Sequence, residues 1–208
     1  MVSSNKSFDR KASRFKPQPS VLVLCEDSKS GKRYLEEAAL HFRARAQVEI
    51  VHCGVTHPSG IVDRAMKRQE HFDKVFCVLD RDTHRCFERA LSEAKSHPKI
   101  TVIASYPCFE FWLLLHFGFS RKPFRSAGKN SPGDLVSKSL RTKPNMANYE
   151  KGKAISYFAQ LLGEPFHRAR TLAPKVLEDV VASGEPNPST EIHLLMDVFE
   201  TLSTPQRI

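Results

Sequence analysis

The sequence predicts an α/β fold in which helices cover both faces of a mostly parallel sheet and a helical cap follows at the C-terminus. Two apolar runs, 21–24 and 75–79, are short and rich in branched side chains, which is typical of strands buried on both faces. Each run stops at acidic residues. Segments of strand length alternate with segments of helical periodicity, and this order predicts parallel strands joined by right-handed crossovers.

The first half of the chain supplies the expected sheet. After the first strand, Ser28 or Ser30 can cap a helix through 34–40, where apolar residues recur every three or four positions. Gly54 ends the second strand, and a Pro-Ser-Gly segment leads into the second helix. The later elements are, in order, a strand at 47–52, a helix at 61–69, a strand at 74–79, a helix at 85–95 and a strand at 100–104.

The second half reads as helical. Residues 111–117 are apolar on all sides and too few for a membrane span, so we expect a buried helix. Residues 121–130 are basic and rich in small side chains, which predicts a mobile loop. Further helices are expected around 133–140, 149–162, 166–172, 175–182 and 190–202. The predicted organisation is a flexible basic arm (1–19), an α/β core (20–120), and a basic loop with a helical cap (121–208).

Composition narrows the class of protein. The chain has 208 residues and a formal net charge of +9, with 32 Lys and Arg against 23 Asp and Glu. This surplus favours a polyanionic partner such as nucleic acid. The five cysteines show no metal-type spacing, and we expect reduced, packed thiols in a cytoplasmic protein. No run approaches a membrane span, and the first residues show no hydrophobic signal region, so export and insertion are not expected.

Three acids follow the predicted strands. Glu26 ends the first strand, while Asp80 and Asp82 form an Asp-x-Asp after the third. Ligands of parallel sheets collect at the carboxyl ends of the strands, so these carboxylates are expected at one rim. Oxygen ligands of this kind suit Mg²⁺ or Mn²⁺, which can polarise a phosphoryl oxygen. The alternative is that they are ordinary solvated loop residues or helix caps.

The chain also resembles a known family, the RloB proteins of restriction and phage-defence loci, which are related to abortive-infection proteins. The resemblance spans about 20–200. Its most specific part is the segment Phe-Glu-Phe-Trp-Leu-Leu-Leu-His-Phe at 109–117. The other matching residues are Cys25-Glu26, Asp80-Arg81-Asp82, Ser105 to Cys108, Tyr149 with Lys151, Ala169-Arg170, and Asn187-Pro188-Ser189-Thr190.

RloB proteins are in turn similar to Toprim domains, the catalytic modules of topoisomerases, primases and certain nucleases. The resemblance implies a Toprim-like, Rossmann-like core and a Mg²⁺-dependent nuclease that acts in anti-phage defence beside an AAA-type ATPase. Carried over by position, Glu26 is the general acid or base and Asp80 and Asp82 bind the metal, with Glu26 also counted as a ligand. Glu110 has no counterpart in the minimal Toprim pattern, but its place at the end of the fourth strand suits a second metal or a role towards the substrate. The substrate can be DNA or RNA, including tRNA, and homo-oligomerisation stays open.

Two positions depart from the family pattern. Asp27 stands where a glycine is usual, and Gly31 stands where a second acid is usual. These changes motivate an alternative hypothesis, a non-catalytic module that binds nucleic acid or the ATPase. A haloacid-dehalogenase-like phosphatase also uses Asp-x-Asp, but after its first strand and with the leading Asp as nucleophile, whereas here the first strand ends in Glu26.

Basic residues near these acids are candidates for binding phosphate. Lys29, Lys32 and Arg33 follow the Glu26 turn at an expected helix N-terminus, a place suited to phosphate. Arg81 and Lys151, with the 121–129 loop, are expected to hold nucleic-acid backbone. The alternative for all of them is a solvated charged surface. The histidines are interpreted structurally: His116 as packed, His84 as a loop residue, and His52 with His57 as lacking zinc spacing.

Overall fold

The computed structural model describes residues 17–153 and 155–204, and it contains a five-stranded sheet in the order β2-β1-β3-β4-β5. The strands are β1 (Val21–Cys25), β2 (Val48–His52), β3 (Lys74–Asp80), β4 (Ile100–Tyr106) and β5 (Ser189–Thr190). The first four are parallel, and the short β5 runs antiparallel to β4. The predicted α/β class is therefore confirmed. The basic arm predicted at 1–19 lies outside the described residues as far as residue 16.

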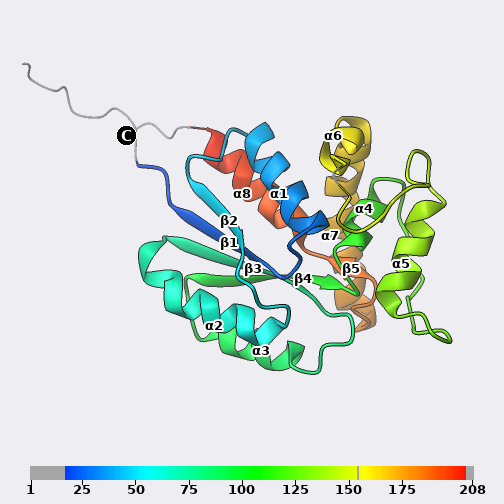
Figure 1. Cartoon of the computed structure of the whole chain (residues 1–208), viewed down its shortest axis with the longest axis horizontal. Helices are drawn as coiled ribbons and strands as arrows, with labels where there is room; N and C mark the ends of the chain where they lie inside the picture. The colour runs from blue at the N-terminus through cyan, green and yellow to red at the C-terminus, as the bar shows by residue number, and fades with distance from the viewer. Residues whose placement is uncertain (1–16, 154, 205–208) are drawn as a thin grey trace, which may run out of the picture.

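Helices cover both faces of the sheet (Figure 1). One face carries α2 (Pro58–Arg68) and α3 (Phe87–Lys95), and the other carries α1 (Ser30–His41) and α8 (Ile192–Ser203). The remaining helices are α4 (Glu110–Leu115), α5 (Pro132–Arg141), α6 (Tyr157–Leu161), α7 (Glu164–Ser183) and the short 3-10 helix η1 (Gln69–His71).

The apolar run of β1 reflects burial on both faces. Leu22 and Leu24 pack into the core beneath α2 and α3, whereas Val21, Val23 and Cys25 pack into the larger core on the opposite side. All five side chains are almost completely buried. A strand between two helical layers therefore needs apolar residues at every position rather than at alternate ones.

The second half differs from expectation in three places. The helix expected at 149–162 is confined to α6, because turns occupy the residues before it. The two helices expected at 166–172 and 175–182 are one helix, α7, which continues through the exposed Pro174 because both halves bury a common apolar side. The strand β5 was not predicted, since two residues give no periodicity.

The loop expected to be mobile at 121–130 is anchored at its start. Arg121 donates to the Asp179 carboxylate at 2.5 Å and to the Glu185 carbonyl at 2.6 Å, and it also contacts the Pro188 carbonyl. These acceptors belong to α7 and the segment that follows it. The sequence showed the charge of the loop but not the acceptors that hold it.

The structure bears on two further expectations, reduced cysteines and the lack of a membrane span. All five thiols are free, and Cys25, Cys77 and Cys108 are buried as expected, whereas Cys53 and Cys86 are only partly buried. Within the described part of the chain, no helix has both the length and the apolar character needed to cross a bilayer.

His116 is packed in the core, as predicted. Its side chain is fully buried, its Nδ1 lies 3.0 Å from the Trp112 carbonyl oxygen, and its Nε2 lies 3.2 Å from the hydroxyl of Tyr34. Burial disfavours the charged imidazolium and lowers the pKa of His116 to about 4, despite the hydrogen bond to the Trp112 backbone. The histidine is therefore a neutral part of the aromatic core at physiological pH.

This burial predicts a pH-dependent stability. Between about pH 6.5, the ordinary pKa of histidine, and about pH 4, the pKa of His116 in the folded protein, His116 is protonated in the unfolded chain but not in the folded one. The free energy of unfolding therefore falls as the pH falls through this window. Between pH 7 and pH 4.5 the expected loss is about 2 kcal/mol. Urea unfolding of wild type and His116→Gln at pH 7 and pH 4.5 measures it: the variant should lose less stability than wild type. Equal losses would contradict a buried neutral imidazole.

Candidate active site

The candidate site lies where the strand order reverses. The chain passes from β1 outward to β2 and then returns to β3 on the other side of β1, so β1 and β3 flank the switch point of the sheet. Glu26 directly follows β1, and Asp80 is the last residue of β3. Crevices at such switch points, outside the carboxyl ends of the strands, are where doubly wound sheets bind ligands.

The Glu26 carboxylate joins the two strand ends. Its Oε2 accepts a hydrogen bond of 3.0 Å from the backbone N–H of Asp80, and its Oε1 lies 2.7 Å from Nε2 of His84. Burial raises the pKa of Glu26, although the Asp80 N–H and His84 partly offset the effect. The predicted convergence of the first and third strand ends is present in the structure.

Asp80 is the acid of the site that is surrounded by other carboxylates. Its Oδ1 accepts a hydrogen bond of 2.9 Å from the backbone N–H of Phe109, which follows β4. Burial raises the pKa of Asp80 well above its ordinary value, and the nearby carboxylates of Glu110 and Glu26 raise it further. Three neighbouring strands therefore gather acids whose mutual repulsion favours binding of a proton or a cation.

Glu110 is the most deeply buried of these acids. Only 1% of the residue is exposed; Oε1 accepts a hydrogen bond of 2.8 Å from the Tyr149 hydroxyl, and Oε2 lies 3.1 Å from Nζ of Lys151. The latter contact is an ion pair rather than an aligned hydrogen bond. Burial opposes the charge of Lys151, but Glu110 outweighs it and raises the pKa of the ammonium. Lys151 therefore carries a fixed positive charge into the acidic cluster.

Asp82 lies on the side of the site that faces α5. Its backbone has a positive φ of 25°, and its N–H donates to the Pro107 carbonyl at 2.8 Å. Its Oδ1 is buried without a hydrogen-bond partner among the described residues. A Cβ at Gly133 of α5 would lie 3.8 Å from its Oδ2, so the start of α5 closely covers this carboxylate.

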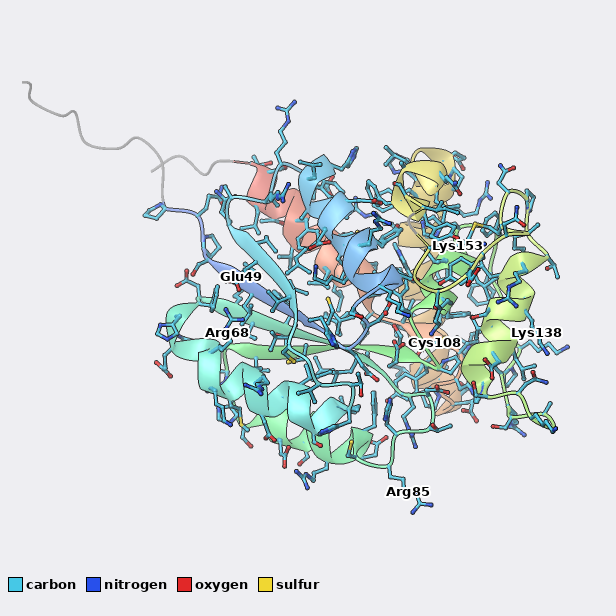
Figure 2. The ribbon with its side chains drawn as sticks, in the orientation of Figure 1. Glu49, Arg68, Arg85, Cys108, Lys138 and Lys153 are labelled. Carbon is cyan, nitrogen blue, oxygen red and sulfur yellow. The ribbon has the colours of Figure 1, made fainter. Side chains whose placement is uncertain are left out.

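A polar pocket of about 380 Å³ opens beside Asp82. The start of α5 and the segment around Lys151 form its walls. Cationic side chains contribute to the lining, namely Lys138, Arg141 and Lys151. In Figure 2, Cys108 marks the carboxyl edge of β4 next to this region, and Lys138 projects from α5; the ion-paired Glu49 and Arg68 lie at the far side of the sheet.

The donor chemistry fits a hard divalent cation in part. Asp80 has one oxygen outside the Phe109 contact, and Asp82 has a buried oxygen with no partner among the described residues. Mg²⁺ commonly uses one or two carboxylates and completes its shell with water and substrate phosphate. Both oxygens of Glu26 are already engaged, however, and no three acidic, histidine or cysteine side chains of the described chain are arranged as a ready metal cage. Asp80 and Asp82 are thus the better candidates for ligands.

The predicted phosphate site at the start of α1 is already filled by a carboxylate. Asp27 accepts hydrogen bonds from the backbone N–H groups of Lys29, at 2.8 Å, and Gly31, at 2.7 Å. Lys32 pairs with Glu36 along the helix. Two of the backbone donors at the start of α1 that could bind a phosphate are therefore occupied by Asp27.

The other predicted basic residues take separate positions. Arg33 contacts the Lys153 carbonyl at 3.4 Å, and the stem of Lys29 lies against Gly152. Arg81 turns towards α3, where its guanidinium donates to the His84 carbonyl at 2.9 Å and lies over the Phe87 ring. Of the five predicted substrate-binding residues, Lys151 makes a direct contact with an acid of the cluster.

Sequence reasoning missed two residues of the site. The sequence predicts a loop residue at His84, although its position two residues after Asp82 and four after Asp80 was a usable signal. Tyr149 was noted only as a family match, and its contact with Glu110 joins positions 39 apart in the chain. No local sequence pattern predicts such a contact. The histidines thought to lack zinc spacing have other partners: His57 caps α2, and His52 contacts the Cys25 carbonyl.

Comparison with known proteins gives one family. A family model described as RloB-like protein matches residues 21–198, which is most of the chain and includes every acid of the site. No significant match was found among curated proteins or among solved structures. The chain therefore belongs to the RloB-like protein family.

Proposed function

We propose that this protein is a Mg²⁺-dependent nuclease whose active site is the acidic cluster at the β1–β3 switch point. The observation that supports this most strongly is the joined placement of Glu26 and Asp80: one carboxylate with a raised pKa lies next to a second that is surrounded by like charge. This pairs a proton-exchanging group with a cation-binding group, the two components that metal-assisted phosphodiester hydrolysis requires.

In this proposal the acids have separate roles. Asp80 and Asp82 would hold the metal, which when bound polarises a phosphoryl oxygen. Glu26 exchanges a proton with a reacting oxygen, since its raised pKa brings it closer to working pH, and His84 at 2.7 Å orients its carboxyl group and shares the proton. Lys151 supplies positive charge beside the substrate phosphate while its contact with Glu110 fixes its position.

Nucleic acid is the proposed substrate class for two reasons. The chain carries a net charge of +9. The pocket beside Asp82 is lined by three cationic side chains together with three acids, Asp82, Asp134 and Glu150, so it offers both phosphate-binding and metal-binding groups. The family resemblance adds a role in phage defence with an AAA-type ATPase as partner. DNA, bulk RNA and tRNA are all substrates to be tested, because a fold hosts many substrates.

Removing the proton-exchanging group tests the activity. Glu26→Gln keeps the size of the side chain and an acceptor for the Asp80 N–H, but it cannot exchange a proton, so cleavage should fall about 100-fold or more. Initial rates on labelled DNA, RNA and tRNA with Mg²⁺ measure this. Glu178→Gln, at an exposed position of α7, is the matched control and should retain wild-type rates. Equal rates for the two variants would reject Glu26 as a catalytic residue.

The metal-binding role of Asp80 gives a test that needs no activity. Because burial and neighbouring carboxylates raise its pKa, the charged form costs stability above its ordinary titration range when no cation is present. Asp80→Asn should therefore raise the melting temperature of the metal-free protein and remove the further rise that millimolar Mn²⁺ gives to wild type. The Glu178→Gln control should keep the response to Mn²⁺.

A second candidate function is a binding module without hydrolysis. It is favoured by the engaged oxygens of Glu26, by the absence of a ready three-ligand cage among the described residues, and by the Asp27 cap on α1. Such a module would bind nucleic acid or the ATPase but show no Mn²⁺-dependent change in melting temperature. The Asp80 experiment thus separates the two functions.

A further inference from the structure

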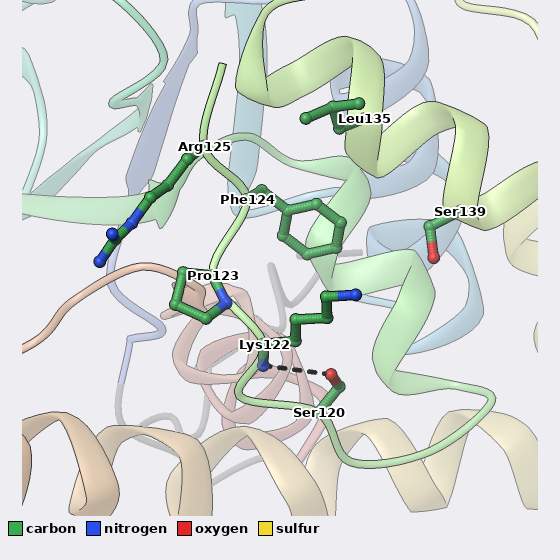
Figure 3. A pocket seen from close by; sticks show the side chains of 7 residues that line it. All are labelled: Ser120, Lys122, Pro123, Phe124, Arg125, Leu135 and Ser139. Atoms are coloured by element: carbon green, nitrogen blue, oxygen red, sulfur yellow. Dashed lines mark hydrogen bonds between the residues drawn. The ribbon is translucent and has the colours of Figure 1, made fainter. Parts of the chain in front are cut away.

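A cationic and aromatic groove lies on the other side of α5 from the acidic site. Its volume is about 730 Å³, and it is formed by the segment 120–125 and one side of α5. The groove is lined by Ser120, Lys122, Pro123, Phe124, Arg125, Leu135 and Ser139. This volume lies within the usual range of ligand pockets, about 300–1,000 Å³. Figure 3 shows the Phe124 ring between the loop and α5, with Leu135 and Ser139 facing it from the helix.

The charge of the groove is uncompensated. Lys122 and Arg125 are exposed, and neither forms an ion pair within the described residues. No acidic side chain contributes to the lining. By contrast, Arg121 in the same segment is paired with Asp179. The groove therefore presents two cations to solvent next to an aromatic ring.

The segment that carries these cations is held in place from both directions. Arg121 binds the end of α7, and Phe124 forms a reciprocal pair with Asn187: its N–H donates to Oδ1 at 3.3 Å, and its carbonyl accepts from Nδ2 at 2.8 Å. Fixing the backbone in advance lowers the entropic cost of binding a ligand. The exposed lysine and arginine thus project from a prearranged backbone.

The groove continues past Phe124 to a second aromatic residue. A smaller hollow of about 120 Å³ shares Ser120, Phe124 and Ser139 with it and adds Phe119 and Lys143. The Phe119 residue is 50% exposed, so its ring is open to solvent. Two aromatic rings with three nearby cations form the pattern by which proteins bind single-stranded nucleic acid, with bases stacked on rings and phosphates near lysine and arginine.

We infer that this groove binds a single-stranded segment of nucleic acid, with a base packed against Phe124 and the backbone held by Lys122 and Arg125. The inference rests on the proposed function, whose substrate it narrows to one with an accessible single strand. The helix α5 presents Leu135 and Ser139 to the groove and Lys138 and Arg141 to the pocket beside Asp82. The bound strand would therefore lie about 10 Å, one helix diameter, from the pocket beside the acids.

Equilibrium binding of labelled oligonucleotides tests the groove separately from catalysis. Fluorescence anisotropy is measured in EDTA, so that hydrolysis does not contribute, with a single-stranded 12-mer and a blunt duplex of the same length. Wild type should prefer the single strand. Phe124→Leu should weaken binding to it about 10-fold, because the stacking surface is lost. Lys122→Ser with Arg125→Ser should weaken binding and reduce the slope of log affinity against log salt by about 1 to 2.

The controls make each outcome decisive. Lys175→Ser, at an exposed position of α7 with no ion pair among the described residues, should bind as wild type, and circular dichroism verifies folding of each variant. Glu26→Gln should also bind normally, so loss of cleavage there with retained binding separates the two sites. Unchanged affinity in Phe124→Leu and in the double variant overturns the groove even if the nuclease is active. Equal losses for single strand and duplex also overturn it, because they indicate a plain polyanion surface.

Discussion

The hydrogen bond from the Asp80 backbone N–H to the Glu26 carboxylate is the constraint on which the acidic site depends. It links the ends of two strands that are adjacent in the sheet but 54 residues apart in the chain. The parallel register brings both strand ends to the same edge, and the hydrogen bond then fixes one carboxylate beside the other. A shift of one residue in the register of β1 against β3 would move the Glu26 side chain to the opposite face of the sheet, away from Asp80.

The surrounding structure holds acidic charge at a cost in stability. Phe109, Tyr149 and Lys151 each donate to or pair with one of these acids, and they come from segments far apart in the sequence. A buried carboxylate without partners would cost several kcal/mol or take up a proton. The second half of the chain therefore does more than cover the sheet, because it supplies hydrogen-bond donors and a positive charge that stabilise the buried acids.

Much of this arrangement was predictable from the sequence, because the signals for it lie in short, continuous stretches of residues. Apolar runs that end in acids indicate β1 and β3, and the rule that parallel strands end at one edge predicts that Glu26 lies with Asp80. The partners of those acids were not predictable in the same way. His84 gave a spacing signal that is common in ordinary loops, and Tyr149 reaches Glu110 only through tertiary packing.

Helix boundaries show the same limit. Pro174 correctly marks an unfavourable position within a helix, yet the apolar side formed by Phe166, Ala169, Ala173 and Val176 is buried on both sides of it. Tertiary burial outweighed the local preference for a break. Likewise, the basic character of 121–130 was clear, but its anchoring depends on acceptors near 179–188 that no neighbouring residue reveals.

The charge of Lys151 bears on the metal site that we propose. Asp80 and Glu110 lie in one cluster with Lys151, and the lysine is held by Glu110 as a permanent counter-charge. It offsets one carboxylate, and the raised pKa of Asp80 indicates that the cluster still favours a proton or a cation at that position. In the proposed nuclease a divalent ion would be held by Asp80 and Asp82, and Glu110 would keep its ion pair with Lys151.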